Sequence, residues 1–351
     1  MPAVRAGFFP LDEQLKLWEK NWSEGVIQDA VWLSGIVEYE KVEEVMDRIG
    51  QMAISDSSAW RRIQKWGARF RAVAEAERIR ANTLPESWEM VPREVQPVGR
   101  MGVAMDGTKI HIRGEGWKEL KVGSVFDVAV RPTLDQDTGD LVERAHAVNN
   151  SYVAHLGGPE IFGQMVWAEA SRRGWERAPD TEALGDGAVW IWNLVADYFY
   201  DSRQLVDWYH GAEHLAAVAR LLKGEGTLAA TRWRNAHETI LYQGHAARIV
   251  QVLSVAAQDQ DDLDVAEELE KEAGYFRNNK RRMKYLEMRE EGWAIGSGMV
   301  ESAGKQFKAR FAGPGMHWSR PGAENLLPVR AAIMSGRFDE LWEQVYNSPQ
   351  N

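Results

Sequence analysis

The chain has 351 residues, no cysteine and a formal net charge of −10 at pH 7. This length suits about two domains of roughly 150 residues each, and the missing cysteines exclude disulfides, thiolate nucleophiles and cysteine-based zinc sites. No run approaches the roughly 18 apolar residues of a membrane span, and residues 1–10 do not read as a signal peptide, so we expect a cytoplasmic protein without membrane contact. The negative charge argues against indiscriminate coating of nucleic acid but is compatible with a local binding site.

Residues 1–81 are predicted to form a helical region. Apolar residues recur at helical spacing over 11–22 and 26–39. The polar segment Ser55–Ser57 then supplies N-cap candidates for a second helix over Ser58–Ile79. The first part of the chain is therefore expected to be a helical domain of its own.

The start of the helix over 58–79 is basic. With the short helix at 40–49 and the turn at Gly50, it resembles a helix-turn-helix. Under that interpretation three side chains are candidate DNA contacts: Arg61, Arg62 and Lys65. Packing of the same helices in a bundle is the alternative. Residues 82–99 hold three prolines and are predicted to be a linker.

After the linker the pattern becomes strand-like. Three runs predict an antiparallel meander, a helix with Phe162, Val166 and Ala170 on one face follows at 159–174, and two further short strands come after it. The predicted strands lie at 100–113, 117–130, 139–148, 183–192 and 204–210. This order is that of a ribonuclease-H-like α/β domain, whose first part would occupy residues 100–210.

From residue 211 to residue 292 the pattern is helical again. Four candidate helices are joined by short polar turns, at 212–222, 227–242, 246–257 and 263–275. We interpret this segment as an all-helical insertion that interrupts the ribonuclease-H-like core. The second part of the core would occupy 293–351, with terminal helices at 325–335 and 338–346.

The second part of the core opens with a glycine-serine turn that leads into a helix-compatible run. In a helix, an apolar stripe would be formed by Val300, Gly304, Phe307 and Phe311. Glu301, Lys305 and Lys308 would form an adjacent polar stripe, which suits a metal ion and a phosphate backbone. The alternative is an exposed pair of Glu301 and Lys305, which surface helices often carry.

Three acids lie on or next to elements of the predicted core: Asp106 in the first strand, Asp186 beside the fourth, and Glu301 at the start of the late helix. The first and fourth strands of a ribonuclease-H-like sheet are neighbours, so we expect one site. Three carboxylates can hold two divalent cations about 3.5–4 Å apart, and Mg²⁺ prefers such oxygen ligands, with Mn²⁺ as an expected substitute. The alternatives are a hairpin turn at Asp106-Gly107 and a plain loop at Gly185–Gly187.

Other polar and aromatic residues have two interpretations each. Asp207 and His210 are either a helix N-cap and a satisfied histidine, or a pair that orients a ligand or a substrate phosphate. Four tryptophans are either packing residues or surfaces on which splayed bases stack, namely Trp190, Trp192, Trp293 and Trp318.

Six stretches carry a resemblance to a known family. They read VAMDGTKI at 103–110, LGDGAVWIWN at 184–193, LVDWYHGAEHL at 205–215, RNNKRRMKY at 277–285, AIGSGMVESAGKQFKARFAGPGMHWS at 294–319 and VRAAIMSGRFDELW at 329–342. From residue 7 to residue 342 the chain resembles the DDE transposases of bacterial insertion sequences, specifically the Kra-type group, which is related to Mutator-like elements.

The resemblance implies roles for particular residues. Asp106, Asp186 and Glu301 match the DDE triad that binds Mg²⁺, and Asp207 and His210 match a C/D-x-x-H motif of Mutator-like relatives. The implied activity is hydrolysis at insertion-sequence ends followed by attack of the freed 3′-hydroxyl on target DNA. We add candidate phosphate contacts from the basic segments, namely Lys305, Lys308, Arg310, Arg281 and Arg282.

The implied partner is double-stranded DNA, both the ends and the target, on which the protein would form a dimer or larger assembly and associate with the nucleoid. Members of the group usually carry a cysteine-rich, zinc-binding segment before a stretch like FFPLDE, which lies here at residues 8–13. We therefore expect either a truncated product or end recognition by residues 11–80 alone. The alternatives are an idle DNA-binding remnant or repressor, and a ribonuclease-H-like nuclease that does not join strands.

Overall fold

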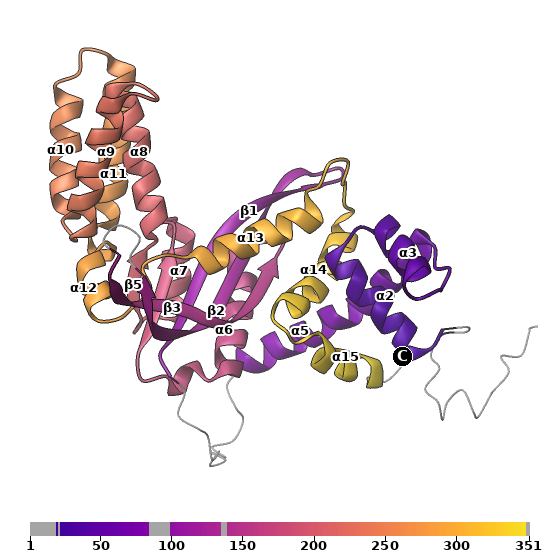
Figure 1. The fold of residues 1–351 in the computed structure, drawn as a ribbon. Helices are drawn as coiled ribbons and strands as arrows, with labels where there is room; N and C mark the ends of the chain where they lie inside the picture. Colours follow the sequence, from indigo (N-terminus) through magenta and orange to yellow (C-terminus); the bar gives the residue numbers. More distant parts are fainter. Residues whose placement is uncertain (1–18, 20–21, 84–98, 135–138, 349–351) are drawn as a thin grey trace, which may run out of the picture. The chain divides into compact units, whose positions relative to one another are not determined.

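The computed structural model describes Glu19 and residues 22–83, 99–134 and 139–348 (Figure 1). The chain divides into two compact units. The helical unit comprises Met1–Glu77, Ile110–Lys118 and Phe307–Asn351, and the sheet unit comprises Arg78–Lys109 and Glu119–Gln306. Apart from Glu19 and Trp22, the helix predicted at 11–22 lies outside the described residues, as does most of the predicted linker.

The protein has a mixed α/β fold built on one five-stranded mixed sheet. Its strands are β1 (Met101–Ile112), β2 (Gly116–Leu134), β3 (Leu141–His155), β4 (Thr181–Gly185) and β5 (Arg203–Val206). The strand order is β3-β2-β1-β4-β5. Strands β2 and β3 are antiparallel, whereas β4 runs parallel to both β1 and β5. The predicted α/β class and the position of each predicted meander strand are confirmed.

The middle of the sheet is buried on both faces. Every residue of β4 is buried, and so are the first five residues of β1, Met101–Met105. Such continuous burial is typical of parallel strands in the centre of a sheet. In β1 the burial ends at Asp106, which is partly exposed. The sheet therefore presents its first acid at the point where the strand leaves the core.

Two predicted strands end earlier than expected. The run 183–192 is a strand only as far as Gly185, and Val189–Tyr198 form helix α7. The run 204–210 stops at Val206, after which helix α8 begins at Trp208. Short apolar runs do not distinguish a buried strand from a buried helix, and the glycines around Asp186 break the strand so that the following apolar residues can form a helix.

Helices α6 (Pro159–Arg173) and α7 pack together, α6 beside β3 and α7 beside β4. The short turn η2 (Trp175–Arg177) follows α6. Proline at the first turn of α6 and Gly174 in the left-handed conformation after its end mark the two boundaries. The predicted apolar face of α6 is confirmed, since Phe162, Val166 and Ala170 are all fully buried.

The predicted helical insertion is a four-helix bundle within the sheet unit (Figure 1). It consists of α8 (Trp208–Lys223), α9 (Leu228–Tyr242), α10 (Ala246–Gln258) and α11 (Leu263–Asn279). Consecutive helices contact one another and α11 returns to α8, as short connections between antiparallel helices allow. The turn η3 (Lys280–Arg282) and the short helix α12 (Tyr285–Glu290) lead out of the bundle. Helix α13 (Gly298–Phe311) follows.

The helical unit combines segments from both ends of the chain. From the first half it contains α2 (Glu24–Ile36), α3 (Tyr39–Arg48), α4 (Asp56–Arg62), the π-turn η1 (Ile63–Gly67) and most of α5 (Ala68–Ala81). From the second half it contains α14 (Arg320–Met334) and α15 (Phe338–Asn347). Residues 307–351, which the sequence analysis assigned to the core, thus belong to the compact unit of the N-terminal helices.

Aromatic stacking holds the helical unit together. Trp66 of η1 is fully buried, and its ring centroid lies 5.2 Å from that of Tyr346 and 5.2 Å from that of Trp342 on α15. Phe70 of α5 stacks on Phe338 at 5.5 Å. Such ring pairs contribute about 0.5–1.5 kcal/mol each beyond their buried area. Among the helices of the described residues, none is long and apolar enough to cross a membrane.

Candidate active site

Asp106 lies inside strand β1 and not in a turn. The turn between β1 and β2 occupies residues 113–115, so the alternative of a hairpin turn at Asp106-Gly107 is wrong. The backbone N–H of Gly107 donates to the Asp106 carboxylate at 2.6 Å. The strand thus fixes the acid at the end of the buried part of β1.

Asp186 follows β4 directly and stands beside Asp106. Met105 of β1 is paired with Gly185 of β4 in parallel register, so the two aspartates continue neighbouring strands in the same direction. The N–H of Ala188 donates to the Asp186 carboxylate at 2.8 Å, which holds it at the start of α7. Parallel strands therefore bring together two acids that are 80 positions apart in the chain.

Glu301 comes from the first turn of α13. One turn later, Gly304 brings the helix over Asp106: a Cβ added at Gly304 would lie 3.9 Å from Asp106 Oδ2. The Glu301 carboxylate is paired with Lys305 Nζ at 2.6 Å, and the side chains are 46% and 74% exposed. An exposed pair at this spacing contributes only about 0.3–0.5 kcal/mol, so Glu301 can exchange Lys305 for another cation.

The three acids share one electrostatic environment. Burial is the main cause that raises the pKa of Asp106, and the negative charges of Asp186 and Glu301 raise it further. The N–H of Gly107 and the charge of His210 act in the opposite direction. Carboxylates gathered in this way repel one another unless a cation or a proton compensates them.

Asp207 and His210 sit beside these acids. Asp207 is 1% exposed and caps α8 by accepting the N–H of His210 at 3.0 Å. Its other carboxylate oxygen accepts the N–H of Ser297, just before α13. Although burial opposes it, hydrogen bonds from His210 and Ser297 hold the pKa of Asp207 below its ordinary value. The N-cap interpretation of Asp207 is confirmed, and the same carboxylate also joins the start of α8 to the residue before α13.

His210 carries a positive charge at neutral pH. Its Nδ1 lies 3.4 Å from Asp207 Oδ1, and this interaction raises the pKa of His210 to about 9, against the opposing effect of burial. The charges of Asp186 and Asp106 add to the increase. The positive charge of the imidazole partly compensates the negative charges of the aspartates around it.

Sequence reasoning missed Tyr275 on α11, which reaches the Asp186 loop. Its hydroxyl donates to the backbone oxygen of Asp186 at 3.0 Å, and burial, with the charge of Asp186, raises its pKa so that it stays protonated. The ring stacks on His214 with centroids 3.6 Å apart, and His214 in turn pairs with Glu272 at 2.7 Å. The helical period of α11 gives no signal for this contact, because its partner is a backbone atom.

The donor set fits a hard divalent cation. Asp106, Asp186 and Glu301 offer only carboxylate oxygens, which Mg²⁺ prefers over nitrogen or sulfur ligands. Over 22–83, 99–134 and 139–348, no three histidine or acidic side chains lie close enough together to hold a metal ion. In the described residues the three carboxylates are therefore not arranged as a ready metal site.

Several candidate DNA contacts have partners within the protein. Arg62 pairs with Glu19 at 2.9 Å and its guanidinium lies 3.7 Å over the ring of Trp22. Lys65 also pairs with Glu19, at 3.2 Å, whereas Arg61 is exposed and donates to a nearby serine hydroxyl. The alternative of bundle packing is supported by the small core that α3 and α4 share, which contains Val42, Met46, Ile54 and Ala59.

The basic residues of α13 differ in exposure. Lys308 is exposed, but Arg310 is only 3% exposed and donates to the backbone oxygen of Ser34 at 2.9 Å. Because its guanidinium is buried between Tyr39 and Trp318, Arg310 is not retained as a DNA contact. The tryptophans favour packing as well: Trp192, Trp293 and Trp318 are all less than 10% exposed.

Comparison of the chain with models of known protein families and with curated proteins gave no match.

Proposed function

We propose that this protein is a DDE transposase with a ribonuclease-H-like catalytic core. Its reaction would be metal-dependent cleavage at insertion-sequence ends, followed by transfer of the 3′-hydroxyl into target DNA. Two observations favour the fold assignment. The first is the strand order β3-β2-β1-β4-β5, in which β2 and β3 are antiparallel and β4 is parallel to both of its neighbours. The second is a helical bundle inserted between β5 and α13.

One observation carries the proposal: acids from three separate elements interact at one end of the parallel strands. Asp106 ends the buried part of β1, Asp186 follows β4, and Glu301 opens α13, while the pKa of Asp106 responds to burial first and then to both other charges. A structural ion pair does not need three acids near one another with only Lys305 and His210 as nearby positive charges among the described residues. A site for divalent cations does.

In the proposed reaction Asp106, Asp186 and Glu301 would hold Mg²⁺, or Mn²⁺ in its place. When bound, such ions activate a water or hydroxyl nucleophile and stabilise the leaving oxygen. Two further residues have proposed roles in the reaction. Protonated His210 places positive charge near the substrate phosphate, and Asp207 holds the start of α13 through Ser297, so that Glu301 begins its helix at a fixed position.

The test uses labelled linear duplexes taken from both sides of the coding gene, with Mg²⁺ and a supercoiled target plasmid. We expect cleaved and joined products from the native protein and a loss of at least about a hundredfold in Glu301→Gln, because one metal-ligating charge is removed. Glu225→Gln is the matched control, since Glu225 is exposed in the turn between α8 and α9.

Calorimetric titration with Mn²⁺ provides a readout that does not depend on turnover. The native protein should bind the ion, and Glu301→Gln should bind it more weakly, whereas Glu225→Gln should match the native protein. Cleavage without joined products would assign the protein to the nucleases of the same fold. Equal activity in Glu301→Gln and the native protein, or none in either, would overturn the proposal.

A further inference from the structure

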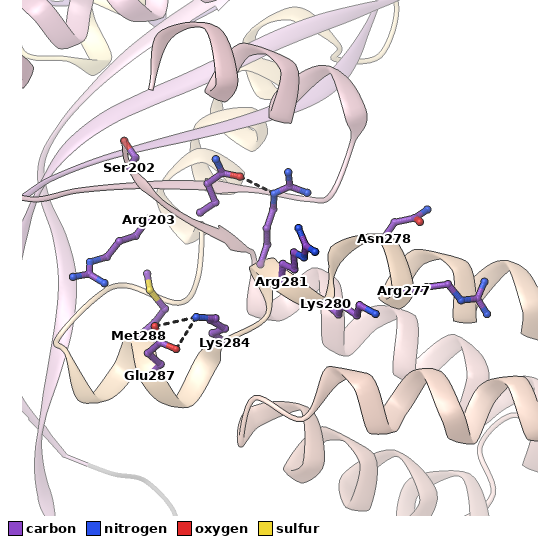
Figure 2. A pocket seen from close by; sticks show the side chains of 11 residues that line it. Ser202, Arg203, Arg277, Asn278, Lys280, Arg281, Lys284, Glu287 and Met288 are labelled. Atoms are coloured by element: carbon purple, nitrogen blue, oxygen red, sulfur yellow. Dashed lines mark hydrogen bonds and ion pairs between the residues drawn. The ribbon is translucent and has the colours of Figure 1, made fainter. Parts of the chain in front are cut away.

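A second feature of the sheet unit is a basic pocket of about 820 Å³ (Figure 2). Three segments line it: residues 202–204 around the start of β5, the end of α11 with η3, and residues 284–288 around the start of α12. The lining contains six arginines and lysines, with Glu287 as its one acid. In a chain of net charge −10, such a local excess of positive charge points to an anionic partner.

Half of the pocket's cations are already neutralised. Arg203 pairs with Glu291 at 2.7 Å, Arg277 with Glu270 at 2.9 Å, and Lys284 with Glu287 at 3.0 Å. The other three are consecutive in η3: Lys280, Arg281 and Arg282. Within the part of the chain that the structure describes, none of these three has an acid at ion-pair distance. Their charge is therefore available to a ligand.

Arg282 is held in place for such a ligand. Its Nε donates to Gln204 Oε1 at 2.8 Å, and its guanidinium lies 4.5 Å from the ring centroid of Trp192, which is buried. One edge of the guanidinium is thus occupied and one face is stacked, while its terminal amino groups have no hydrogen-bond partner among the described residues. A guanidinium fixed in this way matches the two oxygens of a phosphate diester with little loss of side-chain freedom.

The lining favours a polymer backbone over a single nucleotide. No aromatic side chain lines the pocket, and Met288 is the one apolar side chain in the lining. Pockets that enclose small organic ligands are mostly apolar or aromatic, with a few polar groups. A pocket that offers charge without a surface for a base suits contact with phosphates along a strand.

Two elements connect the pocket with the acids. Gln204 lines the pocket at the start of β5, and Asp207 follows the end of the same strand, three residues and about 10 Å further on. That distance corresponds to about three base steps of duplex DNA. Helix α11 likewise carries Tyr275 at the Asp186 loop and Arg277 in the pocket. One DNA strand can therefore reach both places.

We propose that this pocket binds the phosphodiester backbone of DNA, with Arg281 and Arg282 as the principal contacts and Lys280 as an additional charge. The inference rests on the proposed function, which supplies DNA as the substrate, and it names a second contact surface apart from the three acids. Backbone contact of this kind is independent of base sequence and sensitive to salt.

The experiment measures fluorescence anisotropy of a labelled 30-base-pair duplex of mixed sequence with the full chain in EDTA, so that no divalent ion contributes. Arg281→Gln with Arg282→Gln is expected to weaken binding at least tenfold. The slope of log K against log salt should become shallower by about two, because about 0.9 counterion is released per phosphate contact. Lys271→Gln is the matched control: Lys271 is exposed on α11 and paired with Glu268.

Two single variants separate geometry from charge and guard against misfolding. Arg281→Gln changes an exposed residue and should keep the native circular dichroism and melting temperature while making the salt slope shallower by about one. Arg282→Lys retains the charge, so it should keep the slope but weaken binding severalfold, because the planar fork is lost. Unchanged affinity and slope in the double variant would overturn the inference.

Other ligands are tested in the same assay. Inorganic phosphate or a mononucleotide that competes as well as unlabelled duplex, per phosphate, would identify a small-anion site and overturn the polymer assignment. Tighter binding of the same sequence as RNA would overturn the DNA assignment. If the double variant binds DNA normally and the native protein cleaves it, the pocket proposal alone is refuted. If the double variant binds DNA more weakly but the native protein shows no cleavage, the catalytic proposal alone is refuted.

Discussion

The interaction between Asp207 and His210 gives the most direct test of the site's geometry, because it does not depend on substrate or metal. His210 titrates at about 9 in the folded protein against an ordinary value of 6.5. At about 1.4 kcal/mol per pKa unit, the difference corresponds to about 3 kcal/mol. Some of this comes from Asp186 and Asp106, so Asp207 alone should account for about 2 kcal/mol.

Asp207→Asn is the chosen perturbation because it removes the charge but keeps an oxygen that can accept the N–H of Ser297. The raised pKa of His210 means that its contribution to the free energy of unfolding is complete below pH 6.5 and is lost as the pH rises through about 9. The lowered pKa of Asp207 means that its contribution is lost only in strong acid. The pair should therefore stabilise the protein most between about pH 4 and pH 6.5.

The assay combines two measurements in EDTA. Titration of the imidazole nitrogens by nuclear magnetic resonance, with His210→Gln used for assignment, should give a pKa near 9 in the native protein and at least one unit lower in Asp207→Asn. Urea unfolding of the native protein, both single variants and the double variant should give a coupling of about 2 kcal/mol at pH 6 that disappears at pH 10. Asp259→Asn, an exposed change at the end of α10, is the control.

A native His210 pKa between 6 and 7 would refute the reasoning, since the charge pair would then be absent. So would a shift of less than about half a unit in Asp207→Asn, because the cause of the raised pKa would have to be something other than Asp207.

Three further outcomes are expected. Tyr275→Phe should lower the free energy of unfolding in urea by about 1 kcal/mol, because one hydrogen bond to the Asp186 backbone is lost. The variant should also have a lower cleavage rate. An unchanged rate would exclude a role for Tyr275 in holding the Asp186 loop. Gly304→Ala should fold normally, because the new Cβ stays 3.9 Å from Asp106 Oδ2. Gly304→Leu, with its larger side chain, should abolish Mn²⁺ binding in calorimetry. Equal Mn²⁺ binding by both variants would contradict the close approach of α13 to Asp106. Burial raises the pKa of Glu182 well above its ordinary value, so the native protein loses stability as the pH rises through the range in which an ordinary glutamate ionises. Glu182→Gln removes this loss, so the stability of the variant relative to the native protein should increase from pH 4 to pH 8 in urea unfolding. A stability difference that does not change with pH would refute the raised pKa.

The elements that the sequence predicted well are those whose pattern has one explanation. The face of α6 with Phe162, Val166 and Ala170 repeats at helical spacing and is fully buried. The strand that carries Asp106 is long and alternates after its buried half, so the aspartate could be located on a strand before the structure was known. In contrast, the apolar run after Asp186 is too short to show a period, and it proved to be the first turn of α7.

The contacts that sequence reasoning missed use backbone atoms. Tyr275 donates to the carbonyl oxygen of Asp186, and the N–H of Ser297 donates to Asp207. Every residue except proline has these backbone groups, so no residue type at the receiving position marks the contact. Basic residues present the opposite difficulty: Arg62 and Arg310 look like DNA contacts in the sequence, but their acid or carbonyl partners lie elsewhere in the chain.

The base of the helical insertion shows how a large insertion can leave a site intact. Asp207 and Ser297 stand 90 positions apart and are joined by a hydrogen bond, and the N–H of Trp208 donates to the oxygen of Ile295 at 2.9 Å. Closing a flexible loop of that length would cost about 4 kcal/mol. Here α8 to α11 form a bundle whose first and last helices contact each other, so the folding of the bundle itself brings the ends together. The same two hydrogen bonds fix the start of α13, and Glu301 keeps its place beside the sheet whatever the length of the segment between.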